Sequence, residues 1–188
     1  MLDPKQPTTE APNDVEPGHG HVRAAREEKR SSAEAIGIDA DYISGFVERF
    51  YARIREDEVL GPIFAERITD WDVHLDRMKG FWRSILHNTG EFKGNPMLKH
   101  QAIPGLDIAH FSRWLELFYA TLREEEPDAS ATELVASRAR MIADSLLTRI
   151  EMRRTGISGA TNPSMQKSSQ RLCAFGDQFR GYSGLSRD

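Results

Sequence analysis

The 188-residue chain has a single cysteine, Cys173, and no apolar run near the roughly 20 residues needed to cross a bilayer. One cysteine excludes an intramolecular disulfide and is typical of proteins in a reducing cytoplasm. The N-terminus opens with Asp, Lys, Glu and several prolines, so the basic start and apolar stretch of a secretory signal are missing. We therefore expect a cytoplasmic protein without a membrane span.

The chain also has no excess of basic over acidic residues. The chain has 25 Lys and Arg against 29 Asp and Glu, which argues against a nucleic-acid binder. The histidines at 74, 87, 100 and 110 include no i,i+4 pair, and no cysteine cluster accompanies them, so a zinc site is not expected. The single cysteine also excludes a C-x-x-C-H site, so no cofactor can be held there by thioether bonds.

Composition divides the chain into three parts. Residues 1–37 form a predicted flexible N-terminal extension: the first 21 are rich in Pro, Gly and acidic residues, and 22–36 favour a solvated helix without an apolar stripe. Residues 153–188, rich in Gly, Ser, Gln and Arg, form a C-terminal extension predicted to be largely disordered. Between them, residues 38–152 are expected to fold as one domain.

Two long helical patterns fill the first half of that domain. The first begins at Asp39, a good N-cap, and is predicted to stop at Gly61-Pro62. The second begins at Thr69-Asp70 and is the most regular in the chain, with apolar residues at intervals of three and four. Those residues, with one histidine among them, are Trp71, His74, Leu75, Met78, Phe81, Trp82, Ile85 and Leu86.

Three further segments complete the predicted helices. Met97 to His100 can form only about a turn, between a Gly-Asn-Pro loop and Pro104-Gly105. Asp107 caps a third long helix, and Ser130 to Glu133 reads as a capping box for a fourth. No segment alternates like a strand over a useful length, so the predicted fold class is all-α.

Polar side chains interrupt the apolar faces of three helices. His74 lies in the middle of the second stripe, Tyr51 on the inner face of the first helix and Trp114 on that of the third. Each alone is most often an ordinary core residue. All three need hydrogen-bond partners when buried, however, so three of them facing one interior suggest a shared polar ligand.

His100 is the least convincing histidine by spacing. It follows a Gly-Asn-Pro loop on a piece too short to be a stable helix alone, and a surface turn is the simplest interpretation. His74, on its apolar stripe, is the better candidate for a buried ligand. Helix periodicity therefore predicts a pocket with polar groups but does not choose between these two histidines.

Taken in order, a set of short motifs resembles the truncated haemoglobins, globins shortened to four main helices in a two-over-two arrangement. The resemblance covers residues 38–152 and is strongest to the third group of the family, which agrees with the absence of a Gly-Gly dipeptide. The matching segments are Phe50-Tyr51, Leu60-Gly61-Pro62-Ile63-Phe64, Trp71-x-x-His74, Phe81-Trp82, Gly94-x-Pro96-x-x-x-His100 and Phe111-x-x-Trp114-Leu115-x-Leu117-Phe118.

The resemblance implies a role for each residue. His100 is the expected proximal ligand of the haem iron. Three residues are expected on the distal side, where polar groups face the bound gas: Tyr51, His74 and Trp114. The other cofactor-binding candidates are Phe50, Met78, Phe81 and Trp82. Arg77, three residues beyond His74, is placed by helical position alone near a haem propionate, and a solvated surface arginine is the alternative.

The resemblance also implies a function. We expect non-covalent haem b, an iron that is pentacoordinate or regulated from the distal side, and reversible binding of O2 and NO. Distal donors slow gas release, which suits retention or chemistry better than bulk transport. The alternatives are a haem enzyme for nitric-oxide dioxygenation or peroxide reduction, which needs an external reductase, and a cofactor-free helical module whose extensions bind a partner.

Overall fold

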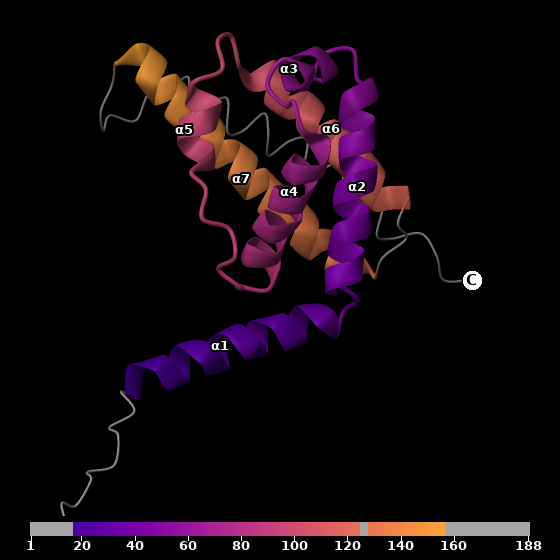
Figure 1. Ribbon diagram of the computed structural model, residues 1–188, viewed down its shortest axis with the longest axis vertical. Coiled ribbons are helices and arrows are strands. Elements are labelled where there is room, and N and C mark those ends of the chain that lie inside the picture. Colours follow the sequence, from indigo (N-terminus) through magenta and orange to yellow (C-terminus); the bar gives the residue numbers. More distant parts are fainter. Residues whose placement is uncertain (1–16, 125–127, 157–188) are drawn as a thin grey trace, which may run out of the picture.

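The computed structural model describes residues 17–124 and 128–156, and within them every regular element is a helix (Figure 1). None of these helices is both long enough and apolar enough to cross a membrane. In chain order the seven elements are α1 (Pro17–Glu34), α2 (Ala40–Glu56), α3 (Gly61–Ala65), α4 (Trp71–Leu86), α5 (Pro96–Gln101), α6 (Ile108–Glu124) and α7 (Ala129–Thr155). The predicted all-α class is confirmed.

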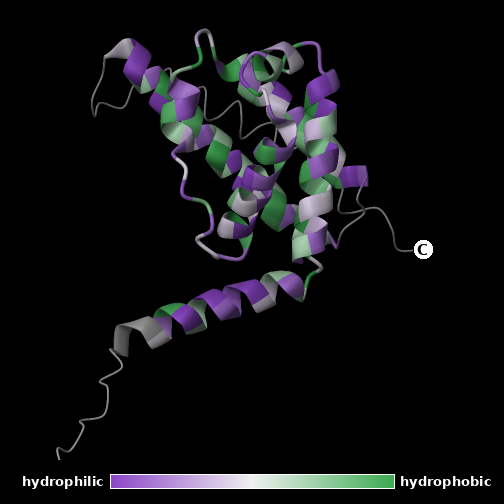
Figure 2. Cartoon of the chain, viewed as in Figure 1, coloured by the Kyte–Doolittle hydropathy of each residue, from purple (hydrophilic) through white to green (hydrophobic). Residues whose placement is uncertain are grey.

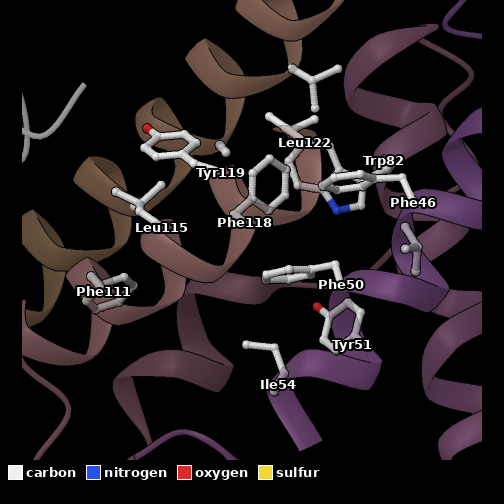
Figure 3. Close-up of a cluster of buried hydrophobic side chains, with 14 of the residues drawn as sticks. Phe46, Phe50, Tyr51, Ile54, Trp82, Phe111, Leu115, Phe118, Tyr119 and Leu122 are labelled. Carbon is white, nitrogen blue, oxygen red and sulfur yellow. The ribbon is translucent and has the colours of Figure 1, made fainter. Parts of the chain in front are cut away.

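Four of these helices form two packed pairs. α2 packs against α4, α6 packs against α7, and contacts between α2 and α6 join the pairs. The core between them is rich in stacked and edge-on aromatic rings, centred on the fully buried Phe50 and Phe118 (Figure 3). The predicted two-over-two arrangement is therefore present. The short α3 and α5 lie beside it, on α2 and α7 respectively.

The two long helices of the first pair begin where the sequence predicts. The Asp39 carboxylate accepts a hydrogen bond from the Tyr42 N–H at 2.7 Å, and Asp70 accepts one from the Val73 N–H at 3.0 Å. Both satisfy backbone donors that have no partner within the first turn of a helix. These caps fix where the inward faces of α2 and α4 begin.

Two predicted boundaries are wrong. α2 ends at Glu56, and Gly61-Pro62 begins α3 instead of stopping the first helix, because proline is well suited to the first turn of a helix. The last helix begins at Ala129, before the predicted capping box. Asp128 is its N-cap and accepts a hydrogen bond from the Ser130 N–H at 2.7 Å, so Ser130 lies within the first turn.

α1 leads away from the packed helices and is mostly hydrophilic along its length (Figures 1 and 2). Its residues 21–32 are all exposed, which confirms the predicted solvated helix, although the helix begins at Pro17, within the predicted tail. The linker that follows is anchored: His87 donates from Nε2 to the Ile38 carbonyl oxygen at 2.7 Å, and both residues are buried. Residues 1–16 and 157–188 lie outside the described residues, so the extents of both extensions stay predictions.

The corner between α2 and α3 is organised by one buried carboxylate. Asp57 accepts hydrogen bonds from the N–H groups of Leu60 and Val59 at 2.8 and 3.1 Å, and from Nε of Arg113 on α6 at 2.7 Å. Burial acts to raise the pKa of Asp57, but the Leu60 N–H, Arg113 and the Val59 N–H outweigh it, so the pKa lies below its ordinary value. This corner sets the position of Leu60 and of α3.

Asp57→Ala is expected to lower the free energy of unfolding by about 1–3 kcal/mol, because it leaves buried donors unpaired. The exposed neighbour provides a control, Glu58→Ala, expected to change it by less than about 0.5 kcal/mol. Since the folded-state pKa is lowered, the stabilisation is complete above the unfolded value of about 3.9 and is lost as pH falls through the folded value. Urea unfolding at pH 7 and below pH 4 measures both effects, and equal losses in the two variants contradict them.

Candidate functional site

A pocket opens between α2, α3, α4, α5, α6 and α7, with about 1160 Å³ of space free of protein atoms, including its open mouth. Most of its wall is apolar or aromatic, with a few polar side chains, as is usual for a cofactor site. The wall is formed by Tyr51, Leu60, Ile63, Phe64, His74, Arg77, Met78, Phe81, Trp82, Phe92, Pro96, Lys99, His100, Ile103, Leu106, His110, Phe111, Trp114, Ile142, Ala143 and Leu146.

His100 enters this pocket from the short helix α5. Asn95 caps that helix by accepting a hydrogen bond from the Leu98 N–H at 3.1 Å, and Pro96 occupies its first turn. Nδ1 of His100 lies 2.7 Å from the carbonyl oxygen of Pro96. Because a carbonyl oxygen can only accept, Nδ1 carries the proton, and in the neutral ring Nε2 then has a free lone pair.

The environment favours that neutral ring. Burial lowers the pKa of His100, and the Pro96 carbonyl offsets part of this effect. A hydrogen bond on the far nitrogen that fixes the tautomer and the ring orientation is the usual support of a metal-bound histidine. His100 therefore presents a neutral, oriented nitrogen donor, although spacing alone favoured a surface turn.

His74 and Tyr51 meet at the pocket wall from α4 and α2. Their ring centroids lie 5.1 Å apart in an edge-on arrangement, and Trp71 packs edge-on against His74 at 5.7 Å. Nε2 of His74 is buried and has no hydrogen-bond partner among the described residues. An unpaired buried polar atom is costly, and it is the feature most easily explained by a ligand that the pocket accommodates.

Both groups are electrically neutral at physiological pH. Burial lowers the pKa of His74, and the nearby positive charge of Arg77 adds to the effect. Burial raises the pKa of the Tyr51 phenol well above its ordinary value, so its hydroxyl keeps its proton. The wall therefore presents hydrogen-bond donors without introducing a full charge into an apolar pocket.

The remaining predicted residues divide between the wall and the core behind it. Trp114, Met78, Phe81 and Trp82 line the pocket, and so does the exposed Arg77. Phe50 is absent from the wall and lies behind it, with its ring centroid 5.1 Å from Tyr51 and 5.3 Å from Trp114. It supports two wall residues by packing against them.

Several wall residues were not identified from the sequence as parts of the site. Phe92 lies in the loop before α5, where there is no helical period to detect, and its ring centroid packs 5.1 Å from that of Phe81. Lys99 and His110 also line the pocket, and Nδ1 of His110 donates to the Asp107 carboxylate at 2.6 Å. On α7, Ile142 belongs to an apolar stripe that looks like ordinary core.

The donor set fits a cofactor that brings most of its own metal ligands. Among residues 17–124 and 128–156, no cluster of three or more His, Cys, Asp or Glu is arranged to hold a metal ion directly. The pocket instead combines one oriented imidazole, one unpaired buried imidazole nitrogen and a wide aromatic wall. Haem, with its four pyrrole nitrogens, needs this kind of site.

The comparisons with known proteins show which family the chain belongs to. Residues 31–147 match the family model of the bacterial-like globins. The group 3 truncated hemoglobin ctb of Campylobacter jejuni is 33% identical over 113 residues, which cover 56% of this chain and 86% of that protein. The chain belongs to this globin family, as a group III truncated haemoglobin.

The three-dimensional comparison supports the same assignment. The crystal structure of a group III truncated hemoglobin from Campylobacter jejuni matches with a TM-score of 0.57 and 31% sequence identity, over 60% of this chain and 91% of that one. The family is one of haem-binding globins, so this truncated haemoglobin is a haem-binding protein and not a cofactor-free module. The matched part lies within the central helices and leaves both extensions largely outside.

His74→Leu is expected to stabilise the haem-free protein by about 1–3 kcal/mol, because it removes a buried nitrogen that has no partner. Val73→Leu, at an exposed position on the same helix, is the control and is expected to change stability by less than about 0.5 kcal/mol. Thermal or urea unfolding of the haem-free proteins measures the difference. A loss of stability in His74→Leu shows instead that Nε2 contributes favourably to the fold.

Proposed function

We propose that this truncated haemoglobin holds non-covalent haem b through Nε2 of His100 and reversibly binds O2 and NO. The observation that carries the proposal is the hydrogen bond from Nδ1 of His100 to Pro96, which leaves Nε2 free in a pocket with an unpaired His74 nitrogen. Haem supplies an iron with a coordination position open to a diatomic gas. The other wall residues decide how long the gas stays.

Three neutral donors are proposed to face the gas: Tyr51, His74 and Trp114. A hydrogen bond to a group that carries charge contributes about 1.5–3 kcal/mol net. Because about 1.4 kcal/mol is a factor of ten, one such donor slows gas release roughly tenfold to more than a hundredfold. Two or three donors make release slow, which suits retention of the gas or chemistry on it better than bulk transport.

The charges at the pocket also suit the cofactor. Arg77 and Lys99 are exposed side chains that reach the pocket wall from α4 and α5. Their positive charges complement the two carboxylates of haem, and we assign to Arg77 the propionate contact that its helical position suggested. The aromatic remainder of the wall excludes water from the iron and so protects it against oxidation.

A second function uses the same site. Nitric-oxide dioxygenation or peroxide reduction needs donors that polarise bound oxygen, and Tyr51 and Trp114 are suitable groups. Such an enzyme needs electrons from an external reductase. Turnover of NO with a reductase, measured against gas release without one, separates the enzyme from the gas-binding protein.

His100→Ala is expected to abolish or alter the Soret absorption band of protein expressed with adequate haem, because it removes the only proposed bond from protein to iron. His110→Ala is the matched control, since His110 lines the same pocket but is held by Asp107. The control is expected to keep the parent spectrum. An unchanged spectrum in His100→Ala, with loss in His74→Ala or His110→Ala, assigns the iron to another histidine.

Tyr51→Phe is expected to raise the rate of O2 release by roughly tenfold or more, because it removes one donor while keeping the ring packed. Flash photolysis or stopped-flow mixing with carbon monoxide measures this rate. Tyr42→Phe, at a tyrosine of the same helix that does not line the pocket, is the control. An unchanged rate in Tyr51→Phe contradicts the proposed role of the hydroxyl.

A further inference from the structure

The α4–α5 loop, residues 87–95, turns back along α4 instead of leading away from it (Figure 1). Asn88 and Gly90 have positive φ angles of 59° and 70°, in the left-handed region that Asn and Gly enter most readily. These two residues reverse the chain just after α4 ends. The rest of the loop therefore runs beside the last turns of α4 before α5 begins at Pro96.

Two successive residues of the loop are bound to α4 by side-chain contacts. Oε2 of Glu91 accepts a hydrogen bond from Nε of Arg83 at 2.8 Å and lies 2.7 Å from Nη2 of the same side chain. Phe92 donates its N–H to Oγ of Ser84 at 2.9 Å, and that hydroxyl donates to the Gly80 carbonyl oxygen at 2.9 Å. Arg83 holds the pKa of Glu91 below its ordinary value, against the effect of burial, so the ion pair persists at neutral pH.

The ring of Phe92 is the contribution of this loop to the pocket. Of residues 87–95, Phe92 alone lines the wall, and its ring packs edge-on against that of Phe81, with centroids 5.1 Å apart. The Phe92 side chain is half-buried, although Glu91 and Lys93 on either side of it are exposed. The contacts of the loop with α4 thus hold one aromatic side chain at the pocket.

The position of this ring explains why residue 94 is a glycine. A Cβ atom at Gly94 would lie 2.4 Å from Cζ of Phe92 and 2.9 Å from its Cε1, which is closer than such atoms approach. The φ angle of Gly94 is not positive, so the requirement is for space and not for an unusual backbone. Any other residue at 94 would push the Phe92 ring from its place. Gly94 also opens the Gly94-x-Pro96-x-x-x-His100 motif, so one short motif serves both the Phe92 ring and the proposed iron ligand.

We propose that the α4–α5 loop controls release of the cofactor, and that Phe92 is the loop residue that covers it. Gly94 and the Arg83–Glu91 ion pair are positioning groups: they act through Phe92 and lie outside the pocket wall. The proposal rests on the proposed binding of haem in this pocket. It adds to that function a set of residues that hold neither the iron nor the gas.

A loop is the part of this wall that opens most easily. The long helices are joined through a common core, in which Phe50 and Phe118 are fully buried. The loop is held on α4 by an ion pair, a hydrogen bond and one ring contact. Segments with few buried contacts open locally at a much lower free energy than the whole fold. The strength of these three contacts is therefore expected to set how fast a bound cofactor leaves.

The first test measures the rate at which the full chain, loaded with ferric haem, loses it to an excess of a haem-free globin, followed at the Soret band. Phe92→Ala is expected to raise this rate by about twofold to tenfold, the effect of losing one aromatic contact. Glu91→Gln is expected to raise it by about twofold to fivefold, because it breaks an exposed ion pair. The matched control is Glu48→Gln, which breaks the ion pair of Glu48 with Lys79 of α4, 2.7 Å long and away from the loop. The control is expected to keep the parent rate.

A double variant tests whether Gly94 acts through the ring. Gly94→Ala is expected to speed haem loss in the parent chain by displacing Phe92. In a Phe92→Ala chain the same substitution is expected to have no further effect, because the ring that it would displace is gone. A general structural role for Gly94 predicts the same fold-change in both chains.

Amide hydrogen exchange of the haem-free protein tests the loop without the cofactor. The Phe92 N–H is expected to exchange at least about tenfold more slowly than in an unfolded chain, because it is bonded to Ser84. Ser84→Ala is expected to remove this protection.

The proposal is overturned by a parent rate of haem loss in Phe92→Ala, or by equal effects of Gly94→Ala with and without the Phe92 ring. It is also overturned by a Glu48→Gln rate as high as that of Glu91→Gln, or by a Phe92 N–H without protection in the parent. A parent without a Soret band instead contradicts the proposed haem site, and the exchange measurement then decides whether the loop is closed.

Discussion

The hydrogen bond from Nδ1 of His100 to the Pro96 carbonyl leaves Nε2 of that ring free, and this free nitrogen is the reason His100 is the proposed iron ligand. It spans one turn of a six-residue helix that has little stability of its own. Asn95 caps the helix, Pro96 fixes its first turn, and its packing on α7 holds it in place. The proposed ligand is therefore positioned by a short segment whose conformation depends on the rest of the fold.

The pocket contains buried polar groups that a core selected for stability alone would not contain. His74 has a buried nitrogen without a hydrogen-bond partner among the described residues, and Tyr51 has a phenol that burial makes harder to ionise. Each is unfavourable in a cofactor-free helical bundle. In the proposed haem site, both are donors toward a small ligand.

Periodicity and capping chemistry predicted the long helices well, because those signals are local. Asp39 and Asp70 begin α2 and α4 as expected. The helix boundaries predicted at Gly61-Pro62 and at Ser130 were wrong. Proline and serine occur both just outside a helix and within its first turn, and neighbouring side chains decide which of the two positions they take. At Asp57 the deciding contact comes from Arg113, which lies far along the chain.

The site was predictable to a different degree. The apolar stripes indicated a pocket with polar groups from three helices, and the structure brings Tyr51, His74 and Trp114 to one wall. Helix periodicity did not distinguish His100 from His74, because the carbonyl that orients His100 belongs to a short turn between loops. The family resemblance supplied the assignment of His100. Phe92 was missed because it reaches the wall from a loop without a repeating pattern.

The most direct test of the central claim is a crystal structure of the protein loaded with haem. The account predicts iron bonded to Nε2 of His100, with Nδ1 still bonded to the Pro96 carbonyl and with Tyr51, His74 and Trp114 on the other face of the porphyrin. Iron held only by His74 or His110, or a His100 ring turned so that Nδ1 no longer meets Pro96, contradicts it.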